Sequence, residues 1–195
     1  MKQILLLLMV LLFSDCTSKR SEEAPKDKEP IVNTITSFLK WHKKGGQYKA
    51  GEYYFIIRHD GVGKLKNYFD KDSISLYYKN FRESGFVSET YIEGLKGYYN
   101  YYEQFLPNKQ KEGELIKIDG LDQDDVLGTF EPEMILDNLD KLKVTQMLVI
   151  YNKALVGINF DKNVDMVFQL TKTKDKWLID YVGPNNSNEH SFFRQ

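Results

Sequence analysis

The chain has almost no cysteine, since Cys16 is the only one among 195 residues. A single cysteine excludes an internal disulfide framework and a zinc site built from cysteines. An excess of charge of one sign is missing as well, because 27 basic residues face 28 acidic ones and the formal net charge is −1. Nucleic acids bind to net basic surfaces, so this balance gives no reason to expect a nucleic-acid partner.

Catalytic motifs are equally scarce. The stretch Gly61-Val62-Gly63 is not a phosphate-binding loop, because the further glycine and the Lys-Ser/Thr pair of such loops are missing. No other motif points to a nucleophile and a base at a spacing that catalysis requires. We therefore predict no catalytic residue, no metal and no cofactor, and an enzyme is not the favoured class of protein.

The chain does contain a targeting segment, at residues 1–15. Lys2 supplies a positive charge, and the apolar run Ile4–Phe13 is short for a bilayer span but has the length of a signal-peptide core. Cys16 follows at the expected cleavage point. This arrangement resembles a bacterial lipoprotein signal, which implies an exported protein anchored to a membrane of the cell envelope through lipid on Cys16. An ordinary secretory signal with an incidental cysteine is the alternative.

The segment after the cysteine has the composition of a linker. Residues 16–30 are rich in charge and nearly free of apolar side chains, so we predict a disordered tether between the lipid and the domain. One folded domain is expected over residues 31–183, because 42% hydrophobic content is enough to build a single core. Residues 184–195 are polar and are expected to form a flexible tail.

Apolar residues at helical spacing predict the helices of this domain. The first is Ile31–Lys44, where Pro30 suits the first turn and Gly45 follows the end. The most regular is Ser88–Leu106, with Ser88 as its N-cap. Three shorter helices are expected at Val62–Phe69, from Ser73 to the break at Gly85, and at Met134–Leu142, and one short strand at Glu52–Arg58.

The stretch Val144–Gly183 predicts an antiparallel β-meander. Runs of strand-forming residues alternate with polar turns, and the runs cover residues 144–151, 154–160, 164–171 and 176–182. In the last run, strict alternation places Trp177, Ile179 and Tyr181 on one face and Asp180 on the other. An antiparallel sheet needs cover on one face, which the helices at 31–44 and 88–106 can supply. The predicted fold class is therefore α+β.

Two stretches carry a resemblance to a known fold. Ile35-x-x-Phe38-Leu39-x-Trp41 lies in the first helix, and Lys174–Val182 forms the last strand. With helices first and a meander after them, Pro30–Gly183 looks like the nuclear-transport-factor-two-like (cystatin-like) α+β cone. More narrowly, the chain is similar to an uncharacterised family of bacterial lipoproteins of that fold. The resemblance implies a cone whose mouth opens between helices and sheet, but fold alone does not give function.

Five side chains are candidates to line that cone: Trp41, His42, Tyr98, Tyr102 and Asp180. A histidine in an apolar stripe could act as a base or a ligand, yet a core histidine with one satisfied hydrogen bond is the favoured interpretation. The tyrosines could contact an aromatic ligand, but tyrosine at helical spacing is first of all a core residue. We expect Asp180 either in solvent or inside a concave pocket.

Residues 118–132 form an acidic loop, which is a candidate interaction site. Its acidic members are Asp119, Asp122, Asp124, Asp125 and Glu131. Their spacing departs from that of a calcium-binding EF-hand loop, so a solvated loop is the expectation.

Three functions follow as hypotheses. The leading one is a cell-envelope-anchored lipoprotein that acts as a binding or interaction module, with a protein or small molecule as its partner. The second is a small-ligand receptor or an enzyme that uses the cone, which needs an open cavity holding a carboxylate or histidine. The third is an inhibitor or immunity-type protein, which needs an exposed apolar or acidic patch.

Overall fold

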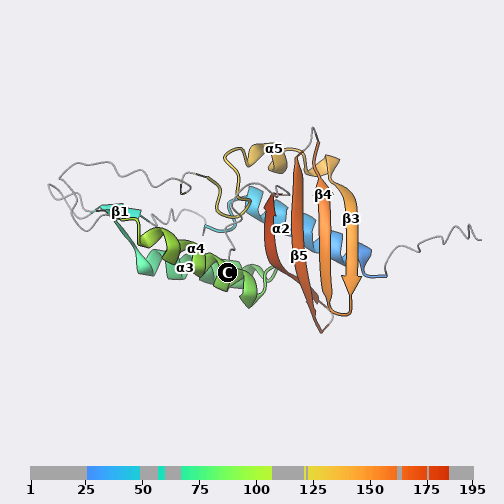
Figure 1. Ribbon diagram of the computed structural model, residues 1–195, viewed down its shortest axis with the longest axis horizontal. Coiled ribbons are helices and arrows are strands. Elements are labelled where there is room, and N and C mark those ends of the chain that lie inside the picture. Colours follow the sequence, from blue (N-terminus) through green and yellow to red (C-terminus); the bar gives the residue numbers. More distant parts are fainter. Residues whose placement is uncertain are drawn as a thin grey trace, which may run out of the picture.

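The computed structural model describes residues 26–48, 57–59, 67–106, 121, 123–161, 164–174 and 176–184. Cys16, Asp119 and Asp122 lie outside the described residues, so the predicted lipidation site and two members of the acidic loop have no structural account. Helices precede a four-stranded antiparallel sheet, which confirms the predicted α+β class. Figure 1 shows the strands side by side and the helices around them.

The sheet is a simple meander, as predicted. Its strands are β3 (Lys143–Ile150), β4 (Lys153–Asn159), β5 (Asp165–Thr173) and β6 (Lys176–Pro184). Each strand pairs with the next in the order β3-β4-β5-β6, so the sheet does not close on itself. Buried side chains alternate with exposed ones along β4 and β5, so one face of the sheet belongs to the core.

Helix α2 (Lys28–Lys43) packs on this core face and passes behind the strands in Figure 1. Its buried stripe contains Ile31, Ile35, Phe38, Leu39 and His42, the five residues that the helical spacing selected. The helix begins at Lys28, three residues before the predicted start. The prediction missed these residues because Lys28 and Glu29 are polar and add nothing to an apolar pattern. The residue before the helix is also fixed, since Asp27 accepts a 2.6 Å hydrogen bond from Lys172 on β5.

Helices α3 (Lys71–Ser84) and α4 (Glu89–Glu103) pack on each other beyond β6 (Figure 1). Ser88 caps α4 as predicted, but Asp70 rather than Ser73 caps α3, because its carboxylate accepts from the amides of Asp72 and Ser73. Gly85 ends α3 at a φ of 69°. This left-handed conformation suits glycine, which confirms the predicted break.

The helix predicted at Val62–Phe69 is wrong at its described end. Residues Asn67–Phe69 form the strand β2, which pairs with β1 (Ile57–His59) in antiparallel register. Phe69 lies opposite Ile57, and its side chain is buried. Apolar residues spaced closely over eight positions fit either a helix or a strand, and pairing with a segment ten residues earlier decided for the strand.

The alternation predicted for the last strand also fails beyond Ile179. Leu170 pairs with Ile179 and Gln169 pairs with Tyr181, so Asp180 is an extra residue in β6. A bulge of this kind shifts the following side chains to the opposite face. Val182, rather than Tyr181, therefore joins the core with Trp177.

The two outer strands of the sheet differ in what lies beside them. Residues 86–88 run along β6, where Ile179 donates to the carbonyl of Phe86 at 2.8 Å and Ser88 donates to the carbonyl of Ile179 at 2.9 Å. Helix α4 starts at this point and contacts the sheet at β6. Helix α2, in contrast, passes behind the strands in Figure 1. Among the described residues, none pairs with the outer side of β3.

The segment before the sheet forms two short pieces instead of one helix over Met134–Leu142. These are α5 (Glu133–Leu136) and the 3-10 turn η2 (Leu139–Lys141). Lys43 at the end of α2 donates to the Leu136 carbonyl at 3.0 Å and to the Asp137 carboxylate at 2.8 Å. The pieces thus lie against α2, at the end of the acidic loop.

Candidate functional site

The acidic loop folds into the protein at Asp124. The backbone amide of Asp124 donates to the Thr129 carbonyl at 2.9 Å, and its carboxylate Oδ1 accepts from the amides of Val126 at 3.0 Å and Leu127 at 2.7 Å. Aspartate commonly closes tight turns in this way. Gly128 completes the turn at a φ of 64°. The loop therefore has a fixed shape in which the second oxygen of Asp124 is directed to a distant partner.

That partner is His42 on α2. His42 Nε2 lies 2.8 Å from Asp124 Oδ2, and the histidine side chain is almost completely buried. Burial lowers the pKa of His42, but the hydrogen bond and charge of Asp124 outweigh it, helped by Gln47 and by the charge of Asp125. The net effect raises the pKa of His42, so the contact with Asp124 favours the protonated ring.

Asp125, the next residue, accepts hydrogen bonds from two phenols. Tyr77 on α3 donates to its carboxylate at 2.9 Å, and Tyr99 on α4 donates to Oδ2 at 2.5 Å. Burial raises the pKa of Asp125, although both phenols oppose the rise by stabilising the ionised form. Burial and the same carboxylate raise the pKa values of Tyr77 and Tyr99, which keeps both phenols protonated as donors.

The two acidic residues join three helices to one loop. Asp124 reaches α2, whereas Asp125 reaches α3 and α4. We call the five side chains His42, Tyr77, Tyr99, Asp124 and Asp125 the loop-anchoring network. The expectation of a solvated loop is wrong for Asp124 and Asp125, because both carboxylates bind side chains inside the protein. Glu131 lies outside the network, with its amide bonded to Thr129 Oγ1 at 3.2 Å.

Catalysis needs a reacting group that a substrate can reach. The side chain of His42 is 2% exposed, and within the described residues its Nδ1 has no partner at hydrogen-bond geometry. The described cavity does not include His42, Asp124 or Asp125 among its lining residues. The network is therefore arranged to hold the loop. This agrees with the favoured interpretation of His42 as a core histidine with one satisfied hydrogen bond, the one from Nε2 to Asp124.

Trp41, Tyr98 and Tyr102 pack against other aromatic side chains in the described part of the protein. Trp41 stacks on Phe38 with ring centroids 5.9 Å apart and meets Phe81 edge-on at 5.1 Å. Tyr98 and Tyr102 are buried core residues whose rings lie 4.8 Å apart. Tyrosine at helical spacing thus behaves as core, which was the favoured interpretation from sequence.

Asp180 does not face solvent but is bound by polar side chains of the described residues. Its carboxylate accepts from Ser88 Oγ at 2.6 Å and from Lys153 Nζ at 3.1 Å, and also from the hydroxyl of Thr171. Only 8% of the residue is exposed. The bulge directs Asp180 to the N-terminus of α4, so this aspartate joins the helix to the sheet.

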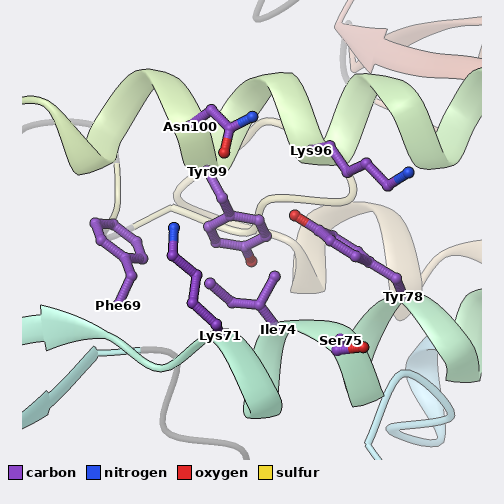
Figure 2. A pocket seen from close by; sticks show the side chains of 8 residues that line it. All are labelled: Phe69, Lys71, Ile74, Ser75, Tyr78, Lys96, Tyr99 and Asn100. Atoms are coloured by element: carbon purple, nitrogen blue, oxygen red, sulfur yellow. The ribbon is translucent and has the colours of Figure 1, made fainter.

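The described cavity lies elsewhere, between α3 and α4, with a volume of about 240 Å³. Figure 2 shows side chains from both helices and from β2 around it. None of the five residues predicted for the pocket lines it. Tyr99 connects the cavity with the loop-anchoring network, because its ring lines the cavity while its hydroxyl binds Asp125. Sequence reasoning missed Tyr77 and Tyr99 as partners of the acidic loop, since only their helical spacing was visible.

Comparison with protein-family models, with curated proteins and with solved structures gives no match. The functional proposal below is therefore based on the geometry of the described residues. Among them, no group of three or more His, Cys, Asp and Glu side chains could hold a metal ion. No helix in the described part of the chain has the length and apolar character to cross a bilayer.

Proposed function

We propose that the protein is a lipid-anchored module of the bacterial cell envelope that binds an extended segment of another protein along strand β3. One observation carries this proposal. Four large apolar side chains are exposed together where β3 turns into β4: Leu148, Ile150, Tyr151 and Leu155. Exposed apolar patches on a sheet edge are typical of interaction sites.

The backbone of β3 is suited to strand addition. It is eight residues long, contains no proline, and has one charged residue, Lys143 at its start. Sheet edges that avoid pairing usually carry proline, inward-pointing charges, a bulge or a covering segment. The register of β3 shifts between Val144 and Gln146, so strand addition is proposed for the regular part Gln146–Ile150. The opposite edge has such a cover in residues 86–88, whereas β3 has none among the described residues. A partner strand could therefore bind through main-chain hydrogen bonds.

The outer face of β3 and β4 would receive the side chains of that partner. Leu148 lies directly opposite Leu155, and the two are 55% and 46% exposed. Ile150, two residues further along the same face, is 53% exposed. An added strand with apolar residues at every second position would cover this row.

The hairpin tip points to function in another way. Tyr151 is 95% exposed and has a φ of 53°. Tyrosine rarely adopts this left-handed conformation, and here no burial of its ring compensates for the cost. A two-residue hairpin connection requires this conformation at its first position, and Lys174 adopts it between β5 and β6 as well (φ 56°). The support for binding is therefore the exposed tyrosine ring at the tip, not its backbone.

Charge favours a partner segment with an acidic residue at the end that meets Lys143. The charged residues of β3 and β4 are Lys143 and Lys153, with no aspartate or glutamate. Lys153 already contacts Asp180, so Lys143 is the main attraction for an acidic partner. A second copy of this chain would bring two more lysines on these strands and no carboxylate.

The anchor and the fold relationship belong to the same proposal. Lys2, the apolar run Ile4–Phe13 and Cys16 support a lipid anchor, and the charged residues that follow support a tether. Helices that precede an antiparallel meander, with α2 on its core face, support the nuclear-transport-factor-two-like arrangement. A tethered domain can present its open edge away from the membrane surface.

The test is photo-crosslinking of the full chain in the cells that produce it. p-Benzoylphenylalanine replaces Tyr151, and light should link this position to an extended, acidic-ended segment of one other protein. Leu148→Lys should reduce the link at least about tenfold, because a buried lysine without a partner is costly. Leu76→Lys is the matched control, since Leu76 is 42% exposed on α3, and it should leave the link unchanged.

Three results would contradict the proposal: no link from position 151, a link to a second copy of this chain, or equal effects of the two lysine variants. Hydrogen exchange tests the binding mode separately. In the complex the amides of β3 should exchange more slowly than in the free protein, while those of α3 should not change. If the β3 amides exchange equally fast in the complex and in the free protein, strand addition is excluded.

A further inference from the structure

From the cavity between α3 and α4 we infer a second binding site, one for a small single-ring carboxylate. This inference is independent of the proposed function, because the cavity lies beyond β6 and the proposed docking surface lies at β3 (Figure 1). Its volume is about 240 Å³. A drug-sized ligand usually needs ~300 Å³ or more, so the site suits a molecule with one ring.

The floor of the cavity is apolar and aromatic. Phe69, Ile74 and Tyr99 line it and are 4%, 6% and 5% exposed. The ring of Tyr99 is central in Figure 2, and its hydroxyl is used by Asp125 outside the cavity. Phe69 meets Tyr99 nearly edge-on, with ring centroids 6.2 Å apart. A flat ring can pack against such a floor in the offset or edge-on geometry that aromatic rings prefer.

The rim is polar, and each of its two lysines pairs with a glutamate of α4 that does not line the cavity: Lys71 with Glu103 and Lys96 with Glu93. Two lysines, Lys71 and Lys96, contribute to the lining, and no carboxylate does. Figure 2 shows Lys71 crossing the cavity mouth toward α4, whereas the ammonium of Lys96 is directed away. Lys71 is therefore the group that would bind an anion. It already binds Glu103 at the rim, but an ammonium has three donors, so a second carboxylate can be accepted.

Two neutral groups complete the rim. Asn100 on α4 also lines the cavity, and Figure 2 shows its amide oxygen directed toward Tyr99 and its nitrogen directed away. Tyr78 points its hydroxyl toward the mouth from α3. Burial raises the pKa of Tyr78, which keeps this hydroxyl a neutral donor. One ammonium, one neutral donor and an aromatic floor match a ring that carries a single negative group.

Calorimetric titration of the purified full chain tests the site, with benzoate as the probe and benzyl alcohol as its uncharged counterpart. Benzoate should bind with a dissociation constant on the order of 1 mM or tighter, as its few atoms allow. Benzyl alcohol should bind at least about tenfold more weakly. Lys71→Gln should weaken benzoate binding about tenfold or more, because it removes a charge-assisted hydrogen bond.

Two matched pairs of variants locate the binding. Lys79→Gln changes another lysine of α3, which pairs with Glu83 and does not line the cavity, so benzoate binding should be unchanged. Ser75→Trp fills the cavity from an exposed position, whereas Leu76→Trp adds the same ring one residue away. Binding should be lost in Ser75→Trp and kept in Leu76→Trp.

The inference is overturned if benzoate does not saturate the protein, or if benzyl alcohol binds equally well. It is also overturned if Lys79→Gln weakens binding as much as Lys71→Gln, or if Ser75→Trp still binds. Circular dichroism of each variant verifies that the fold is kept. Since Ser75 and Lys71 are both exposed at the helix surface, either variant can be used if the other fails to fold.

Discussion

At the scale of single residues, His42 and Asp124 are the most consequential pair. They are 82 positions apart in sequence, and 2.8 Å separates their polar atoms. The sequence marked His42 as a histidine inside an apolar stripe and Asp124 as one acid among several. Neither property identifies a partner, because an apolar period describes one helix and not the loop that packs on it. Their contact belongs to the tertiary structure.

The pair should make stability depend on pH. A raised pKa in the folded protein means that the pair contributes fully below the ordinary histidine pKa of 6.5, and that this contribution is lost as the pH rises through the folded value. We expect a lower urea midpoint at pH 8 than at pH 6. His42→Gln should flatten this dependence, and His59→Gln should keep it. An unchanged slope in His42→Gln would contradict the assignment.

Tyr151 is a second residue whose conformation has a measurable consequence. Its φ of 53° suits asparagine better than tyrosine. Because the ring is 95% exposed, its removal costs little packing energy. Tyr151→Asn should therefore stabilise the isolated protein by about 1 kcal/mol. Tyr101→Asn, at a 55% exposed position inside α4, should instead destabilise it slightly because asparagine is a poorer helix residue. Thermal unfolding of both variants distinguishes strain at the turn from a general effect of the substitution.

At the scale of elements, boundaries were predictable where a local signal exists. Ser88 caps α4 and Gly85 ends α3, because both residue types have intrinsic preferences for those positions. The cap of α3 was placed at Ser73 instead of Asp70, since both residue types cap helices and the apolar stripe begins near both. The bulge at Asp180 had no local signal at all. It exists because the carboxylate binds Ser88, Thr171 and Lys153.

Ser88 should be the more important of the two caps. Its hydroxyl accepts from the Tyr91 amide at 3.4 Å and donates to Asp180 at 2.6 Å, so it joins α4 to the bulge. Ser88→Ala should cost about 2 to 3 kcal/mol, since it removes a cap and a hydrogen bond to a charged group. Asp70→Ala removes a cap alone and should cost about 1 kcal/mol. Equal losses in urea unfolding would mean that the bond to Asp180 adds no stability.

At the scale of the whole molecule, the architecture separates two surfaces. The core face of the sheet is covered by α2, while its outer face and the β3 edge lie away from the helices (Figure 1). The observed sheet is open, and the cone expected from the resemblance stays a prediction. The predicted pocket residues are instead used in packing and in joining helices to sheet. Function is therefore proposed for the outside of the sheet.

The lipid anchor is a prediction at this same scale, and fractionation tests it. Cys16→Ser should move the full-length protein from the membrane fraction to the soluble fraction, because each buried CH₂ of an acyl chain contributes about 0.8 kcal/mol to membrane binding. Ser14→Ala is a control that leaves the cysteine in place. A Cys16→Ser variant that still sediments with membranes would contradict lipidation.

The sequence by itself determined the α+β class, the four strands of the meander, the core stripe of α2 and the positions of Ser88 and Gly85. These features depend on the spacing of apolar residues and on turn preferences, which act over a few residues. Only the tertiary structure decided that Asn67–Phe69 forms a strand, that Asp124 and Asp125 turn inward, and that none of the described residues pairs with the outer side of β3. Each of these depends on a partner far away in sequence, and local preferences carry no information about which distant segment will supply it.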